Sequence, residues 1–113
     1  MLDAQKQTYG DGLDENYMHP YMWACKSHYY SPGLHFYNFP YAFGLLFGMG
    51  VFAIYQQKGE AFIPEYDALL VATSLGDVKE VAASVGIDVT DVNFWRSSIR
   101  VLEGMIDEMD ALI

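Results

Sequence analysis

The apolar residues nearest the C-terminus recur with the period of an α-helix. From residue 92 to residue 113 the spacings alternate between three and four, at Val92, Trp95, Ile99, Leu102, Ile106, Met109 and Ile113. This is the a/d pattern of a helix that packs along another helix. Further apolar residues widen the stripe, which favours a helix inside a globular bundle over a two-stranded coiled coil; they are Phe94, Val101, Met105 and Leu112. Coiled-coil dimerisation through this helix is the alternative.

A second helix is predicted from about His35 to Lys58, in a run that is apolar on all sides. Pro40 suits only its first turn or a kink, and Gly59 suits the position just after its end. The uncharged stretch from residue 39 to residue 55 is at the short limit of a membrane span. Its glycines suit close helix packing, so we expect a buried core helix and no membrane insertion.

Two shorter helices are predicted between these. The first begins near Pro64, ends before Gly76, and places four residues on one face: Tyr66, Leu69, Leu70 and Thr73. The second has Asp77 as its N-cap and Gly86 after its end, with a buried stripe of Val78, Val81, Ala82 and Val85.

Neither a useful β-alternation nor an internal repeat occurs in the sequence. We therefore predict an all-α fold, a bundle of about four to five helices, in which residues 1–113 form a single helical segment. Residues 1–15 are expected to form a loop or the start of a helix, because glycines alternate with acids there. Residues 16–44 are rich in tyrosine and histidine, with short helices at best between the prolines, and residues 45–113 form the bundle.

Composition limits the classes of function. Six basic residues against fifteen acidic ones give a net charge of -9, which repels phosphate backbones and argues against nucleic acid as a partner. The single Cys25 cannot form an intrachain disulfide, and it is expected to be a small core residue. No signal-peptide pattern is present at the N-terminus, so a cytoplasmic location is expected.

No metal site is expected in this chain. The three histidines, His19, His28 and His35, are spaced by nine and seven residues and are separated by Pro20 and by the Ser-Pro-Gly break at 31–33. None of them belongs to an H-E-x-x-H motif, and no carboxylate lies among them to complete a ligand set.

The candidate chemistry lies between Ser27 and Gly44, where histidines and tyrosines gather without any charged side chain. A phenol donates a hydrogen bond without bringing a charge, and such donors suit a developing oxyanion. Tyr37 and Tyr41 are four residues apart, which predicts a shared helix face, and the Pro-Gly break allows the backbone to bring His28 back toward them. The alternative is an amphipathic, half-buried aromatic belt.

Three stretches in this order, "WACKSHYY", "FYNFPYAFG" and "LLVATSLGDVKEVAASVGIDVTDVNFW", resemble the C-terminal part of the catalytic domain of oligoendopeptidase F, a zinc metallopeptidase related to thimet oligopeptidase. The resemblance extends from about Tyr9 to Ile113. It implies a helical fold around a deep cleft, where an H-E-x-x-H helix and a later glutamate hold zinc. None of those zinc residues is in this chain, so zinc is a cofactor of the full-length family and none is expected here.

The resemblance also implies roles for individual residues. The family's late histidine, in a Trp-Ala-x-x-x-His context, matches His28, and its paired tyrosines match Tyr37 and Tyr41; these three would bind the substrate or the oxyanion. Tyr30 and His35 are expected to contact substrate, although His35 is otherwise a surface histidine of the inserted Ser-Pro-Gly-Leu-His segment. The chain departs from the family pattern where Phe39 and Pro40 replace a tyrosine and a glutamine.

Three hypotheses of function follow, of which the third is a small membrane protein that detergent-free solubility would exclude. In the first, the chain is a C-terminal fragment of an oligoendopeptidase F-like enzyme that acts on oligopeptides and is inactive alone, because the zinc site and general base are absent. In the second, it is a stand-alone helical interaction module without catalysis, whose helix 35–58 packs against a partner. In either of these two cases exposed apolar surface predicts a homo-oligomer, a dimer in the simplest form.

Overall fold

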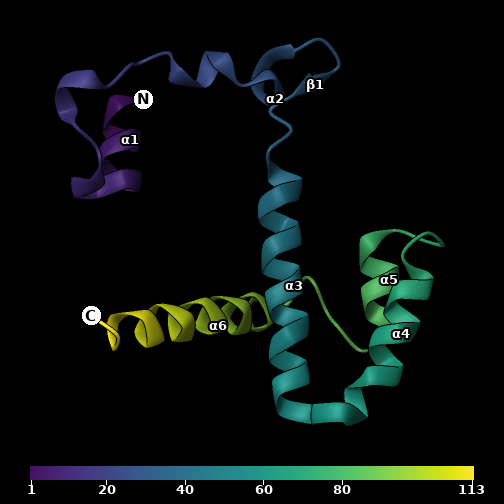
Figure 1. The fold of residues 1–113 in the computed structure, drawn as a ribbon. Helices are drawn as coiled ribbons and strands as arrows, with labels where there is room; N and C mark the ends of the chain where they lie inside the picture. Colours follow the sequence, from purple (N-terminus) through teal and green to yellow (C-terminus); the bar gives the residue numbers. More distant parts are fainter. The chain divides into compact units, whose positions relative to one another are not determined.

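The protein is mostly helical, which confirms the all-α class. The computed structural model describes residues 1–113, apart from the side chain of Tyr30. In the described backbone the only strand is the two-residue β1 (Leu34–His35). The chain divides into two compact units, Met1–Pro40 and Tyr41–Ile113 (Figure 1).

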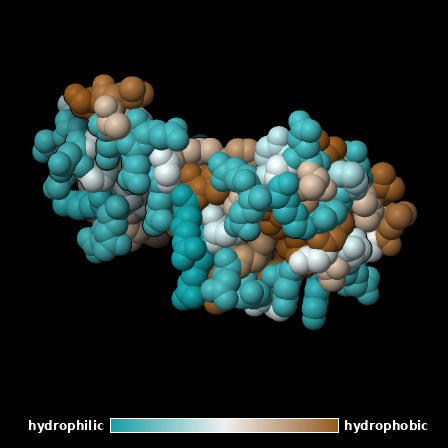
Figure 2. All heavy atoms as spheres, turned by 90° about the horizontal axis from the view of Figure 1, so that it is seen from below, coloured by the Kyte–Doolittle hydropathy of each residue, from teal (hydrophilic) through white to brown (hydrophobic). Residues whose placement is uncertain are grey.

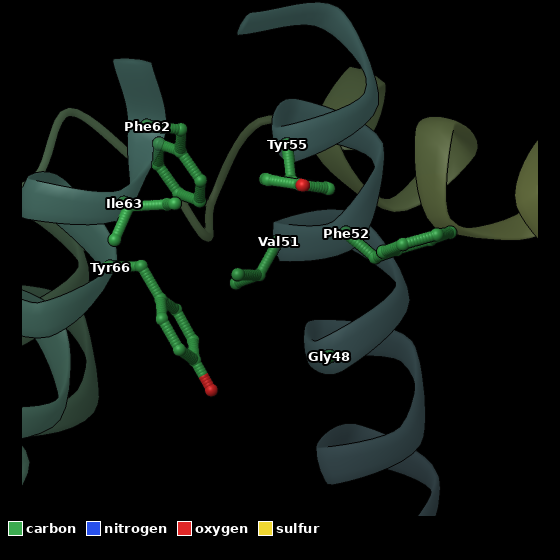
Figure 3. A pocket seen from close by; sticks show the side chains of 7 residues that line it. All are labelled: Gly48, Val51, Phe52, Tyr55, Phe62, Ile63 and Tyr66. Atoms are coloured by element: carbon green, nitrogen blue, oxygen red, sulfur yellow. The ribbon is translucent and has the colours of Figure 1, made fainter. Parts of the chain in front are cut away.

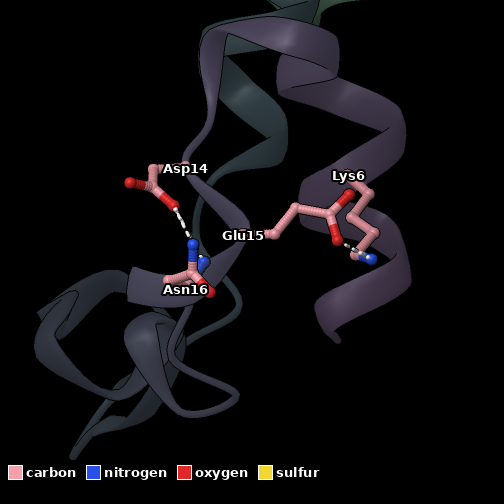
Figure 4. Close-up of polar contacts among 4 residues, drawn as sticks. All are labelled: Lys6, Asp14, Glu15 and Asn16. Atoms are coloured by element: carbon pink, nitrogen blue, oxygen red, sulfur yellow. Dashed lines mark hydrogen bonds and ion pairs between the residues drawn. The ribbon is translucent and has the colours of Figure 1, made fainter.

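The first unit begins with α1 (Leu2–Tyr9), where the sequence predicts a loop or the start of a helix. Short 3₁₀ turns follow at Gly10–Gly12, Glu15–Tyr17 and Met22–Cys25, and α2 (Ser27–Tyr30) precedes β1. Lys6 of α1 forms an ion pair with Glu15 at 2.6 Å, while the Asp14 carboxylate caps the next turn by accepting from the Asn16 N–H at 2.9 Å (Figure 4). The described residues of this unit include none that is fully buried.

The second unit contains most of α3 (Phe39–Lys58), then a 3₁₀ turn at Gly59–Phe62, α4 (Ile63–Ala72), α5 (Val78–Ser84) and α6 (Val92–Asp110). Gly59 and Gly86 end their helices with φ of 62° and 77°, in the left-handed region that favours glycine. Asp77 caps α5 and Asp91 caps α6 by accepting backbone N–H bonds. These boundaries agree closely with the sequence predictions.

The helix predicted from His35 begins later, at Phe39. Residues 36–38 form a turn, in which Phe36 has a φ of 52°. Pro40 then occupies the first helical turn, where its missing N–H costs nothing. The predicted start was therefore wrong by about one turn.

The core of the second unit is small. It consists of Val51, Phe62, Leu69, Ala82 and Ile87, surrounded by partly buried neighbours from α3, α5, α6 and the segment between α5 and α6. The prediction of a buried α3 was wrong, because only Gly50, Val51 and Ala53 of that helix are buried. On α4 only Leu69 is buried, so the predicted face with Tyr66, Leu70 and Thr73 is exposed. On α5, Ala82 faces the core while Val78 is exposed.

Two close contacts fix the helices of this unit. Phe94 and Ser98 of α6 approach Gly50 so closely that a Cβ there would lie 2.5 Å from Phe94 Cζ and 2.7 Å from Ser98 Oγ. Lys58 at the end of α3 forms an ion pair with Glu65 of α4 at 2.6 Å and lies 5.5 Å from the centre of the Phe62 ring. The first contact requires the absence of a side chain at Gly50, and the second uses the long, flexible side chain of Lys58.

A large apolar surface remains exposed. The helical run Phe39–Ala72 is long and apolar enough to cross a membrane, a property that the core helix of a soluble protein shares. Of the apolar 18-residue stretch on which this rests, 17% is buried. Figure 2 shows hydrophobic side chains at the surface between hydrophilic ones. Exposed apolar residues occur on α3, α4 and α6.

Candidate functional site

A tight chain reversal places the backbones of His28 and Tyr37 next to each other. The Tyr37 N–H donates to the His28 carbonyl at 2.8 Å, and the Phe36 N–H donates to the Tyr29 carbonyl at 3.3 Å. Between them Ser31 and Leu34 form an antiparallel bridge, and Gly33 takes a φ of 93°. The Pro-Gly break thus brings Tyr37 back to His28, as the sequence predicts.

The side chains of this hairpin lie at the surface. His28 is half-buried, Tyr37 is 40% exposed, and His35 on β1 is exposed. The Tyr37 ring stands edge-on to Phe39, with 6.1 Å between ring centres. The predicted substrate contact of Tyr30 lies outside the described residues, because its side chain is not described.

Tyr41 belongs to the other unit. It lies in the first turn of α3 and is 62% exposed. Because α3 begins at Phe39, Tyr37 precedes the helix, and the predicted helix face shared by Tyr37 and Tyr41 does not exist. The structure therefore brings together the backbones of His28 and Tyr37, while Tyr41 begins the second unit.

Part of the aromatic stretch forms a belt in the first unit. Trp23 and Tyr29 meet edge-to-face at 6.4 Å, and Tyr29 meets Phe36 in the same way at 6.1 Å. With Met1 these rings line an apolar cavity of about 300 Å³. The interpretation as a half-buried aromatic belt thus fits Tyr29, which lies half-buried between the Trp23 and Phe36 rings. Tyr37 lies outside these contacts and meets the Phe39 ring instead.

The remaining reactive side chains have local roles. The His19 Nδ1 accepts from the Tyr21 N–H at 3.1 Å. Cys25 is exposed, so the prediction of a core cysteine was wrong; its thiol donates to the Met22 carbonyl at 2.8 Å. Among the residues that the structure describes, no group of three or more His, Cys, Asp or Glu could hold a metal ion.

A second candidate site, missed in the sequence, lies between α3 and α4. It is an apolar cavity of about 330 Å³ lined by Gly48, Val51, Phe52, Tyr55, Phe62, Ile63 and Tyr66 (Figure 3). Gly48, Phe52 and Tyr55 follow the helical period on one side of α3, and the short turn after Gly59 folds Phe62 and Ile63 back against them. The apolar walls and two phenols suit a hydrophobic side chain or small molecule.

Fold and site together define a mostly helical protein of two units, the first of which contains a hairpin with His28 and Tyr37. No protein-family model, curated protein or solved structure matches this chain.

Proposed function

We propose that His28, Tyr37 and Tyr41 bind the backbone of an oligopeptide and stabilise an oxyanion, as the C-terminal segment of an oligoendopeptidase F-like zinc metalloendopeptidase. Tyr30 and His35 contact the substrate beside them. Neutral donors of this kind contribute roughly 2.7–4 kcal/mol each to transition-state stabilisation where they meet the developing charge.

One observation carries the proposal: the hydrogen bond from the Tyr37 N–H to the His28 carbonyl, at 2.8 Å. It holds the two residues on one hairpin, so an imidazole and a phenol project from adjacent backbone positions. The Tyr37 side chain is 40% exposed, which leaves its surface accessible to a peptide. Tyr41, at 62% exposed, is accessible in the same sense.

The residues of this chain do not fit a zinc site. The sequence contains no H-E-x-x-H, and the described side chains form no group of ligands. The attacking water and its general base must therefore come from other polypeptide, and this chain contributes binding and electrostatic stabilisation only. Alone it does not hydrolyse peptides.

The proposal is tested by peptide binding and by turnover. Titration of the ¹⁵N-labelled protein with an oligopeptide should shift the amide signals of residues 28–41. Tyr37→Phe should weaken binding about 2- to 10-fold, the loss of one hydrogen bond. Tyr17→Phe is the matched control, because Tyr17 is 85% exposed in the same unit and outside the hairpin.

Incubation with zinc and a fluorogenic oligopeptide provides the second readout. No cleavage is expected at any protein concentration. Cleavage that scales with the amount of protein contradicts the proposal. Peptide binding that is unchanged in both Tyr37→Phe and His28→Ala also contradicts it.

The exposed apolar surface favours a second candidate function, a helical module that associates with another copy. On α3 and α4, Leu45 is 53% exposed, Leu70 is 50% exposed and Val71 is 73% exposed. Such surface is uncommon on a monomer in water. Sedimentation velocity at micromolar concentration should show a homodimer, and a monomer contradicts this function.

A further inference from the structure

Most of the seam predicted on α6 does not pack inside the chain. Phe94 and Ser98 approach Gly50 of α3, and Val101 lines a hollow with Ala53 of the same helix. The residues of the a/d seam follow these by one position each, so they lie about 100° further around the helix. The helix therefore has two apolar stripes. The first packs on α3, and the second contacts α3 through Trp95, whose ring centre lies 5.4 Å from that of Phe43.

Most of the second stripe, the α6 seam, is exposed. Ile99 is 46% exposed, Ile106 is 54% exposed and Met109 is 55% exposed. Trp95 and Leu102 are half-buried, and every residue from Glu103 to Ile113 is exposed. Figure 1 shows α6 crossing α3 and continuing beyond it as a single helix toward the C-terminus. A regular heptad seam on such a segment is typical of a helix with a partner.

The charges of α6 are arranged against its own dipole. Arg96 and Arg100 lie in its N-terminal half, and four acids lie in its C-terminal half, at Glu103, Asp107, Glu108 and Asp110. A helix dipole favours the reverse, with acids near the N-terminus and bases near the C-terminus. None of the ion pairs among the described residues includes an α6 side chain. Apart from the N-cap Asp91, the charges of α6 thus oppose its dipole.

We propose that the α6 seam binds the α6 seam of a second copy of this chain in the antiparallel direction. Antiparallel pairing places the basic half of each helix along the acidic half of the other, whereas parallel pairing places acids beside acids. Arg96 and Asp110 flank the seam on the same side, fourteen residues apart, and an antiparallel pair brings Arg96 of one copy near Asp110 of the other. The inference deepens the second candidate function, self-association, by naming its surface, partner and direction.

The first experiment locates the surface by sedimentation velocity. Ile106→Glu places a carboxylate in the seam and should raise the dimer dissociation constant about 10-fold or more. Val71→Glu, on the exposed face of α4, is the matched control and should leave the dimer intact. Because Ile106 is 54% exposed, urea unfolding of Ile106→Glu should match the wild type at concentrations below the dimer dissociation constant, where both proteins are monomers.

The outcomes separate the two ideas. A dimer that survives Ile106→Glu and dissociates with Val71→Glu overturns the α6 inference and keeps self-association through α4. A wild-type monomer at micromolar concentration overturns both. Arg96→Glu and Asp110→Arg should each weaken the dimer, and the double variant should restore it; no restoration contradicts the charge pairing.

The second experiment determines the direction by cross-linking in a Cys25→Ser background, because Cys25 is exposed. A mixture of the Ile99→Cys and Met109→Cys chains should form a cross-linked heterodimer with a short bismaleimide, identified by mass. Each chain alone should cross-link poorly, since its two cysteines are ten residues, or about 15 Å, apart along an antiparallel pair. Efficient cross-linking of Met109→Cys with itself indicates a parallel pair and overturns the proposal.

Discussion

Gly50 is the residue on which the crossing of α3 and α6 depends. Replacement by alanine puts a Cβ 2.5 Å from Phe94 Cζ, which forces the ring or the helix to move. We expect Gly50→Ala to lower the free energy of unfolding by about 1–3 kcal/mol, measured by urea denaturation. Gly44→Ala is the control on the same helix, because nothing lies within 4 Å of its added Cβ.

The free energy of unfolding of the control variant, Gly44→Ala, should change in the opposite direction. An exposed helical glycine costs roughly 0.5–1 kcal/mol relative to alanine, so Gly44→Ala should raise stability by about that amount. Equal effects of the two variants would contradict the close approach at Gly50.

The Asp88 carboxyl has a lowered pKa in the loop before α6. The first cause is the Thr90 hydroxyl, which donates to Asp88 Oδ1 at 2.6 Å; the Thr90 N–H adds a second bond at 2.8 Å. A carboxyl with a depressed folded pKa stabilises the fold above its unfolded pKa, and that stabilisation is lost as pH falls through the folded pKa. The contribution of Asp88 to stability is therefore lost only at acidic pH.

We expect Thr90→Val to raise the pKa of Asp88 toward its ordinary value, as measured by NMR titration of the carboxylate. The acid unfolding midpoint should also move to higher pH. Thr73→Val removes a hydroxyl that donates to the Leu70 carbonyl, so it should leave the Asp88 pKa unchanged. An Asp88 pKa that ignores Thr90→Val would contradict the assigned cause.

Local signals at single residues explain which predictions were right. Asp77, Gly59 and Gly86 could be assigned from the sequence because caps and left-handed glycines act within one turn of chain. The prediction that Tyr37 shares a helix face with Tyr41 was wrong because it depends on where α3 begins. Pro40 is compatible with helices that begin at several different residues. The reversal at Gly33 was predictable, since it depends on the adjacent residues alone.

At the scale of elements, α5 depends strongly on its cap. Its seven residues are too few for a stable isolated helix, and Asp77 satisfies the Glu80 N–H through its carboxylate and the Val81 N–H through its carbonyl, both at 2.9 Å. Asp77→Ala should cost about 0.5–2 kcal/mol of stability in urea unfolding. Asp67→Ala, inside α4 and exposed, should cost nothing; equal losses would refute the capping role.

Hydrophobic periodicity located the helices but not their buried faces. The heptad seam of α6 is the most regular pattern in the chain, yet the buried residue of that helix is Ser98. Burial follows the close approach to Gly50, which one sequence does not reveal. Likewise α3 is apolar on all sides, so its composition could not show which residues would face α4 and leave the cavity beside Tyr66.

At the scale of the whole molecule, stability is concentrated in the second unit. All buried residues among those that the structure describes lie between Gly50 and Ser98, and none of them belongs to Met1–Pro40. Burial of apolar surface is the main source of stability, so the first unit can contribute little of it. Its contacts are those of partly exposed rings such as Tyr29 and Phe36, and surface ion pairs such as Lys6–Glu15, of the kind worth about 0–1 kcal/mol.

We therefore expect residues 41–113 to fold without the first unit. The unfolding midpoint of this fragment in urea should stay close to that of the full chain, with a smaller change in far-UV circular dichroism. Phe62→Ala, which removes a 1% exposed core ring, should lower stability by about 3–5 kcal/mol in both forms. An unfolded fragment beside a folded full chain would contradict this expectation, because residues 41–113 would then need the first unit in order to fold.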